Sequence, residues 1–262
     1  MRSRIWVCGF LLPLLISVAL VGSTARPVRV DSPPKLDGVG TRTTCQASAC
    51  VAQQLTTSQR NDVVLLFVLT GSNTTTLAVS DGSGLTFTQR LAFASESFVG
   101  GMIWEYYAVA SSPLDSDNIT VVPDQCCYTI RGLQVLGISG AHILTVYDQD
   151  PSVPATVSCP SATCGYCYAN ANTNPGACSA SVQTISADLV IAAAQINDAP
   201  SCGGYQYSPA GYHPPPGFTR LSAPNGNFEI DYAITYTPSH IEFDCKGTDA
   251  TAIVVDAIIE SG

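Results

Sequence analysis

The feature that most constrains this chain is an internal repeat of strand-like segments. Four apolar or alternating cues occur twice in the same order, at residues 61–66 and 187–192, 84–91 and 217–221, 104–108 and 230–234, and 133–141 and 252–260. Short runs of this kind, bounded by turn residues, are typical of β-strands. The recurrence therefore predicts a duplicated unit of strands.

Short strands separated by turn signals account for both halves of the chain. The first unit is expected to contain strands near 63–69, 74–80, 85–90, 102–110, 119–122 and 129–139, and the second near 179–185, 188–196, 217–223, 228–236, 240–245 and 251–261. No segment longer than about ten residues has the capped 3.6-residue period of a helix. The sequence predicts an all-β sandwich or jelly roll, built by duplication of a five- to six-stranded unit and stabilised by disulfides. One shared core is favoured over two small domains, because no linker clearly separates the halves.

The N-terminal residues are typical of an exported chain. Residues 1–25 have a charged start, a long apolar run and small residues at Ser23, Thr24 and Ala25, which predicts a secretory signal that is cleaved. Residues 26–44 contain three prolines and two glycines and are expected to form an extended tail. The sandwich domain is expected at 45–262, with repeat units at about 49–148 and 177–262 and inserts at 149–176 and 198–216.

The charge balance limits the partners of the chain. Removal of Arg2 and Arg4 with the signal leaves nine basic residues against twenty acidic ones, a net charge of −11. Phosphate backbones require a basic surface, so nucleic acid is not an expected partner. Charged residues make up 12% of the chain, about half the usual share. A surface with so little charge repulsion favours self-association, and no membrane span is expected after the signal is removed.

Cysteine usage agrees with an extracellular location. Ten cysteines remain after the signal: Cys45, Cys50, Cys126, Cys127, Cys159, Cys164, Cys167, Cys178, Cys202 and Cys245. An even number in an exported chain predicts a framework of up to five disulfides, whose pairing the sequence leaves open. The pair Cys164 and Cys167 also has the spacing of a zinc half-site, but thiols oxidise outside the cell, so disulfides are favoured and no metal site is expected.

The two inserts carry the candidate ligand-binding residues. Tyr205, Tyr207, Tyr212 and His213 lie beside three prolines in the second insert, and such a stiff aromatic face suits the stacking of sugar rings. The alternative is a loop that simply packs over the end of the sandwich. Asn73 and Asn118 begin N-glycosylation motifs in segments expected to be turns.

Several acidic residues invite a catalytic or metal-binding interpretation. Glu105 and Asp231 occupy matching places in the two repeats and would resemble a glycosidase pair if they faced each other; the alternative is a charge on the solvent face of a strand. Asp62 and Asp188 also match, each just before an apolar run, where an aspartate usually forms a turn. No nucleophile elbow is present, and no cofactor is required. We therefore expect a protein that is not an enzyme.

The sequence predicts no cofactor, and a bound calcium ion is the alternative. Oxygen-rich turns suit this ion, and acidic residues stand near turns throughout the chain. The candidate ligands are Asp81, Asp148, Asp150, Asp198 and Asp249.

Three motifs also resemble a known family. The runs 77–88, 104–108 and 133–141, with their echoes to residue 260, resemble a repeated β-sandwich of exported surface proteins in archaea and some bacteria. The resemblance implies a sandwich fold and an exterior location, but no catalytic residues. Together with the composition, it favours a structural subunit of an extracellular filament or coat, assembled by strand addition through the tail. A carbohydrate-binding or adhesive module is the second hypothesis, and a secreted hydrolase is the third.

Overall fold

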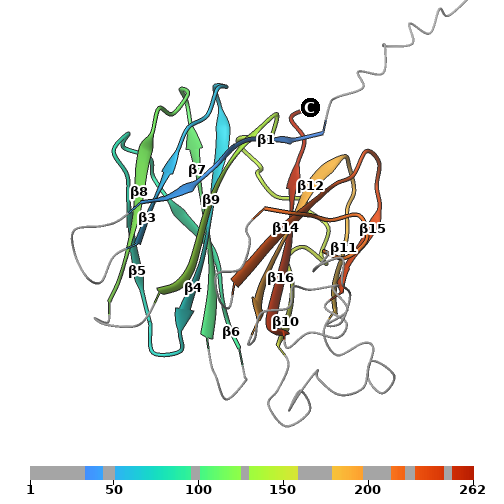
Figure 1. The fold of residues 1–262 in the computed structure, drawn as a ribbon. Coiled ribbons are helices and arrows are strands. Elements are labelled where there is room, and N and C mark those ends of the chain that lie inside the picture. The colour runs from blue at the N-terminus through green and yellow to red at the C-terminus, as the bar shows by residue number, and fades with distance from the viewer. Residues whose placement is uncertain are drawn as a thin grey trace, which may run out of the picture. The chain divides into compact units, whose positions relative to one another are not determined.

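The chain forms strands throughout the part that the structure describes. The computed structural model describes residues 33–43, 51–95, 101–124, 130–158, 179–196, 214–221, 228–244 and 250–262. These residues contain no helix and form antiparallel sheets, as expected for an all-β protein (Figure 1). They all belong to one compact unit, which agrees with the absence of a linker between the halves.

The described residues of this unit form four sheets. The first inner sheet has the order β1 (Lys35–Val39), β9 (Ile130–Ser139), β4 (Asp62–Gly71), β7 (Gly101–Ala110) and β6 (Thr88–Ala94). The first outer sheet has the order β2 (Thr41–Thr43), β3 (Val51–Leu55), β8 (Asp117–Pro123) and β5 (Leu77–Ser80). The second inner sheet has the order β10 (Ala155–Ser158), β16 (Ala250–Ile259), β12 (Asp188–Ile196), β14 (Phe228–Ile234) and β13 (Thr219–Arg220). The second outer sheet pairs β11 (Ser179–Gln183) with β15 (His240–Asp244).

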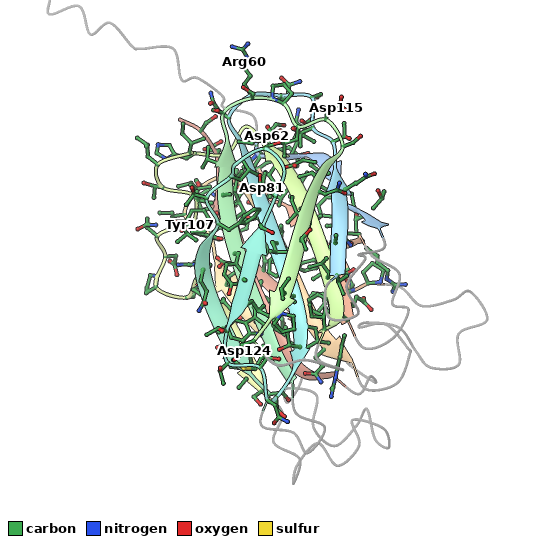
Figure 2. All side chains as sticks on the ribbon, turned by 90° about the vertical axis from the view of Figure 1, so that its left-hand side faces the viewer. Arg60, Asp62, Asp81, Tyr107, Asp115 and Asp124 are labelled. Carbon is green, nitrogen blue, oxygen red and sulfur yellow. The ribbon has the colours of Figure 1, made fainter. Side chains whose placement is uncertain are left out.

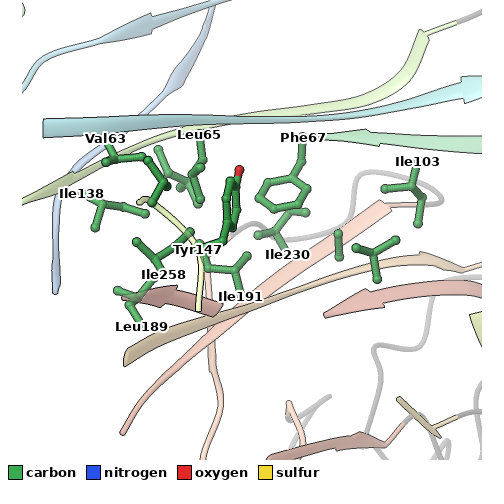
Figure 3. Close-up of a cluster of buried hydrophobic side chains, with 14 of the residues drawn as sticks. Val63, Leu65, Phe67, Ile103, Ile138, Tyr147, Leu189, Ile191, Ile230 and Ile258 are labelled. Atoms are coloured by element: carbon green, nitrogen blue, oxygen red, sulfur yellow. The ribbon is translucent and has the colours of Figure 1, made fainter. Parts of the chain in front are cut away.

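Three hydrophobic clusters hold these sheets together. One lies between the first outer and first inner sheets, and another between the second inner and second outer sheets, so each half is a β-sandwich. The third cluster, called here the central core, lies between the two inner sheets and joins the sandwiches. In Figure 3 the side chains of Val63 and Leu65 face those of Leu189 and Ile258 across the central core.

The buried position of β4 explains its uninterrupted apolar sequence. Val63, Leu65 and Phe67 point into the central core, whereas Val64 and Leu66 point into the first sandwich. Successive side chains of a strand alternate between its faces, so a strand covered on both faces must be apolar at every position. The same alternation divides β12 between the central core and the second sandwich.

Some strands lie where the sequence predicts none. β1 and β2 fall inside the expected tail, and β1 pairs with β9 of the same chain from Lys35 opposite Ser139 to Val39 opposite Leu136. β10 falls inside the insert at 149–176 and pairs with β16. Both β1 and β10 are short edge strands that follow prolines, and such strands have too few apolar positions to produce a clear pattern. The strand expected at 85–90 begins later, at Thr88.

A single glutamine closes the side of the first sandwich. The Gln53 side chain on β3 donates a 2.7 Å hydrogen bond from Nε2 to the Leu133 carbonyl and accepts one of 2.7 Å from the Val135 N–H. These two backbone groups belong to β9 beyond the end of β1, where no strand covers them. Gly40 completes the closure by donating to the Val135 carbonyl at 2.8 Å.

Candidate functional site

A group of polar side chains lies buried between the two sandwiches. Glu105 stands in the middle of β7 opposite Phe67, and Asp256 stands in the middle of β16 opposite Ile191. Phe67 and Ile191 both point into the central core, so both carboxyl groups lie on that side of their sheets. Glu105 is 0% exposed and Asp256 is 1% exposed. We call Glu105, Asp256, Arg90 and Tyr147 the interface carboxyl group.

Arg90 and Tyr147 complete this group. The Arg90 Nε lies 2.9 Å from the Asp256 Oδ2, and the Arg90 Nη2 lies 3.5 Å from the Oδ1. The Ala257 N–H also donates to the Asp256 Oδ1 at 2.9 Å. The guanidinium carbon is 4.1 Å from the centre of the Tyr147 ring, which is a cation–π contact. The Tyr147 ring stands inside the central core, with its hydroxyl on the side of β4 (Figure 3).

Burial changes the acidity of both carboxyl groups. Burial, and then the negative charge of Asp256, raise the pKa of Glu105 well above its ordinary value, against the opposing effects of the Tyr147 hydroxyl and Arg90. Burial also raises the pKa of Asp256 to about 6, although Arg90 and the Ala257 N–H lower it. A charged carboxylate is costly in an apolar interior unless donors surround it. Both carboxyl groups therefore hold a proton more strongly than an exposed acid does.

A similar pair of acids lies at the start of β4. Asp62 is 0% exposed and lies toward one end of the first sandwich, while Asp124 lies toward the opposite end (Figure 2). Burial, a hydrogen bond with Asp37 and the charge of Asp37 raise the pKa of Asp62 to about 6. The Asp37 carboxylate in turn accepts hydrogen bonds from Ser58. Asp62 is thus a buried acid and not the turn former that its position at the start of a strand predicts.

The start of β12 carries another pair. Burial and a hydrogen bond with Asp148 raise the pKa of Asp188 to about 8. Asp148 accepts 2.7 Å hydrogen bonds from the N–H groups of Asp150 and Ile185, and the Ser186 hydroxyl donates to the Asp188 Oδ1 at 2.6 Å. Both members are buried, at 2% and 0% exposure. The aspartates that match in the sequence repeat therefore each stand beside a second aspartate.

Glu105 and Asp231, which occupy matching places in the sequence repeat, lie in different cores of the structure. Glu105 faces the central core, but Asp231 lies opposite Ala192 and so faces the interior of the second sandwich. Burial raises the pKa of Asp231 to about 6, opposed by Glu229 and Arg220. Neither residue is on a solvent face, so both interpretations made from the sequence are wrong. The cause is the stacking of the sheets, which buries both faces of β7 and β14, and the hydrolase hypothesis loses its paired carboxylates.

The acidic turns use their oxygens within their own loops. The Asp81 Oδ1 accepts hydrogen bonds from the N–H groups of Ser83 and Leu85 at 2.7 and 2.9 Å. The Asp150 Oδ1 accepts from the N–H and hydroxyl of Ser152. Among the described residues no cluster of three or more histidines, cysteines or acidic residues has metal-binding geometry. Asp198 and Asp249 lie outside the described residues.

The aromatic and cysteine candidates also lie outside the described residues. This applies to Tyr205, Tyr207, Tyr212 and His213, and to all ten cysteines of the mature chain. The described strands that flank these segments meet at one end of the sheets, as the pairings Thr70–Ile130, Val51–Val121, Ser158–Ala252, Ser179–Asp244 and Gln195–Phe228 show. The acid pairs at the starts of β4 and β12 stand at the other end.

The two glycosylation motifs are both described. Asn73 is exposed in the turn after β4, as expected. Asn118 is also exposed, but it is the second residue of β8 and pairs with Gln54 of β3, so the turn predicted there is wrong. The Thr75 hydroxyl of the first motif is hydrogen bonded to Asp124.

The partners of Glu105 and Asp62 were not apparent from the repeat alone. A signal for Asp256 does exist, because it is the only charged residue of β16, just as Glu105 is the only charged residue of β7. A lone acid inside an apolar run indicates a buried carboxyl group that needs a partner. No comparable signal identifies Asp37 or Arg90, whose positions depend on the packing of separate strands.

Comparison with known proteins adds no identity to these observations. No family model, curated protein or solved structure matches the chain. Among the described residues there is also no helix of the length and apolar character that crossing a membrane requires.

Proposed function

We propose that this protein is an exported, non-enzymatic structural subunit that self-associates into a surface filament or coat. The observation that carries the proposal is the way β1 is held. This N-terminal strand is added to the edge of the first inner sheet, where it pairs with β9, and Leu36 packs against the central core. Strand addition at a sheet edge is a recurrent mode of assembly between chains.

The contacts of β1 suit exchange between copies. Among the described strands β1 pairs only with β9, and its register shifts between Leu36 and Gly38. Its continuation, β2, pairs with β3 in the first outer sheet. Residues 35–43 would therefore move as one segment and make the same backbone hydrogen bonds with β9 and β3 of a neighbour. Such exchange is a low-cost route to self-association because the contacts already exist within one chain.

The remaining edges support assembly in the same way. Among the described strands, β6 and β13 end their inner sheets with one neighbour each. An open edge presents unpaired backbone N–H and C=O groups, which bind further strands unless charge protects them. The low share of charged residues, 12% of the chain, leaves little such protection.

We also infer that the two sandwiches come from duplication of one unit. The order β1-β9-β4-β7-β6 corresponds step by step to β10-β16-β12-β14-β13, and β3-β8 corresponds to β11-β15. The equivalent central strands β4 and β12 both begin with a buried aspartate beside another aspartate. A repeated strand order with a repeated buried acid pair supports the duplication that the sequence predicts, and we propose disulfides among the ten cysteines as its covalent support.

A carbohydrate-binding or adhesive role is the second candidate. It is supported by the strand ends that flank the aromatic and cysteine-bearing segments, which gather at one end of the sheets. Loops clustered at one end of a sandwich are a common binding surface. Glycan-array binding that is lost in the combined Tyr205→Ala, Tyr207→Ala and Tyr212→Ala variant would establish this role.

The structural role is tested on the mature chain by negative-stain microscopy and light scattering. The chain from residue 26 should form filaments or a regular coat, and so should a chain from residue 33, which keeps β1. A chain from residue 44 lacks β1 and β2 and should not assemble, but should bind an added peptide of residues 33–43. A strictly monomeric mature chain overturns the proposal. Assembly by the chain from residue 44 overturns the strand-exchange mechanism.

A further inference from the structure

The two sandwiches are joined by polar contacts as well as by the central core. Arg90 comes from β6 of the first inner sheet, and its ion-pair partner Asp256 comes from β16 of the second. Glu105 of β7 belongs to the first inner sheet and interacts with Asp256. The interface carboxyl group therefore spans the junction between the sandwiches, and its charge bears directly on that junction.

The charges around this group do not balance when both acids are ionised. Among the described residues, Arg90 from β6 and Tyr147 from the segment between β9 and β10 are the other titratable groups that interact with it. The cross-strand neighbours of Glu105 and Asp256 are the apolar side chains of Phe67, Leu91 and Ile191. Two carboxylates would thus face one guanidinium. One retained proton makes the group neutral.

The hydrogen bonds indicate which acid keeps that proton. Asp256 accepts from the Arg90 Nε and from the Ala257 N–H, each at 2.9 Å. These donors stabilise an ionised carboxylate. Within the described part of the chain, neither buried oxygen of Glu105 receives a hydrogen bond of standard geometry. Glu105 is therefore the protonated member, because it has weaker donors than Asp256, and an ionised carboxylate with weak donors is costly in an apolar interior.

We propose that the proton on Glu105 closes the junction between the two sandwiches, and that raising the pH, which favours its loss, loosens the junction. Ionised Glu105 would place a second negative charge beside Asp256 between the inner sheets, with a single guanidinium to offset both. The least costly relief is separation of the sheets, which admits water to the carboxylates. The outer faces of the inner sheets remain covered by β3, β8, β11 and β15, so each sandwich keeps its own core.

The test compares the mature wild-type chain with Glu105→Gln by hydrogen exchange between pH 5 and pH 8. Glutamine has the shape of the protonated acid and can donate to Asp256, but cannot lose a proton. After correction for the intrinsic exchange rate, the opening constant at Phe67 and Ile191 in the wild type should rise up to about tenfold per pH unit. In Glu105→Gln this rise should be much smaller. Glu242→Gln is the matched control, because Glu242 is exposed on β15.

A measurement on the wild type keeps the test independent of how the variant folds. Infrared spectroscopy at pH 7, on protein whose glutamate carboxyl carbons are labelled with carbon-13, should show the isotope-shifted C=O stretch of a protonated buried glutamate, and Glu105→Gln should lack that band. The label separates this band from that of protonated Asp188, which does not shift. Spectra of the wild type without such a band overturn the proposal. An equal pH dependence of the opening constant in Glu105→Gln and the wild type also overturns it, as does a loss of that dependence in Glu242→Gln.

Discussion

Gln53 shows how one side chain can take the place of a strand. β9 continues beyond the end of β1, and its N–H and C=O groups on that edge need other partners. The primary amide of Gln53 provides a donor and an acceptor with the spacing of a backbone ladder, reaching Leu133 and Val135. Gly40 leaves room for it, since a Cβ at that position would lie 2.4 Å from the Gln53 Oε1.

We predict that Gln53→Ala destabilises the protein by about 1–3 kcal/mol, because it leaves a buried N–H and a buried C=O of β9 without partners. Gln54→Ala is the matched control, since Gln54 lies next in β3 on the opposite face and is half-buried. Urea unfolding measured by the fluorescence of Trp104 gives both free energies of unfolding. If both variants lost the same free energy of unfolding, the hydrogen bonds of the Gln53 amide would contribute nothing beyond side-chain packing.

The inner strands illustrate how packing between sheets limits side-chain size. A Cβ at Gly132 of β9 would lie 2.5 Å from Phe228 of β14, so the Phe228 side chain occupies the space that a side chain on residue 132 would need. Gly101 of β7 has the same relation to the buried side chain of Gln195. These glycines weaken their strands locally, but they let the central core close at this end of the sheets.

Gly132→Ala should therefore destabilise the chain by about 1–3 kcal/mol, as overpacking of a tight interior does. Gly71→Ala serves as the control, because a Cβ there meets nothing nearer than the Arg131 side chain at 3.9 Å. Thermal unfolding of both variants followed by circular dichroism provides the comparison. The expected loss is confined to Gly132→Ala. An unchanged midpoint in that variant would mean that the inner sheets can separate slightly at no cost.

Strands were predictable from the sequence where both faces are buried or where alternation is regular. β4, β7, β9, β12 and β16 have apolar runs of strand length and lie close to the predicted ranges. β1, β2 and β10 were missed because short edge strands make few apolar contacts and have weak patterns, and β1 and β10 also follow prolines. The stacking of two sandwiches was not predictable either. The stacking of the sandwiches places Glu105 beside Asp256 and not beside Asp231. Which sheet faces meet depends on packing between strands that are distant in sequence.

At the scale of the whole molecule, buried acids determine how stability depends on pH. The pKa of Asp62, Asp231 and Asp256 is raised to about 6, and that of Asp188 to about 8, in each case mainly by burial. Their ordinary value in the unfolded chain is 3.8, so between pH 4 and pH 8 the folded state binds more protons than the unfolded state. The free energy of unfolding therefore falls as the pH rises through this range. Asp37 acts in the opposite direction, because hydrogen bonds from Ser58 and Gln59 outweigh burial and lower its pKa, so its contribution is lost only in strong acid.

We predict that the mature protein is most stable near pH 4 and loses stability steadily toward pH 8. Asp256, which is almost fully buried, contributes on the order of 3 kcal/mol to this loss, and the melting temperature should fall by roughly 10 °C. Calorimetry across the range measures the profile. Asp188→Asn separates the contributions, because it should make the decline shallower across the whole range from pH 4 to pH 8, whereas removal of an acid with a folded pKa of about 6 should affect only the part below about pH 6. A melting temperature that rises from pH 5 to pH 8 would mean that the buried acids are ionised in the folded state, with donors that the strand packing described here does not supply.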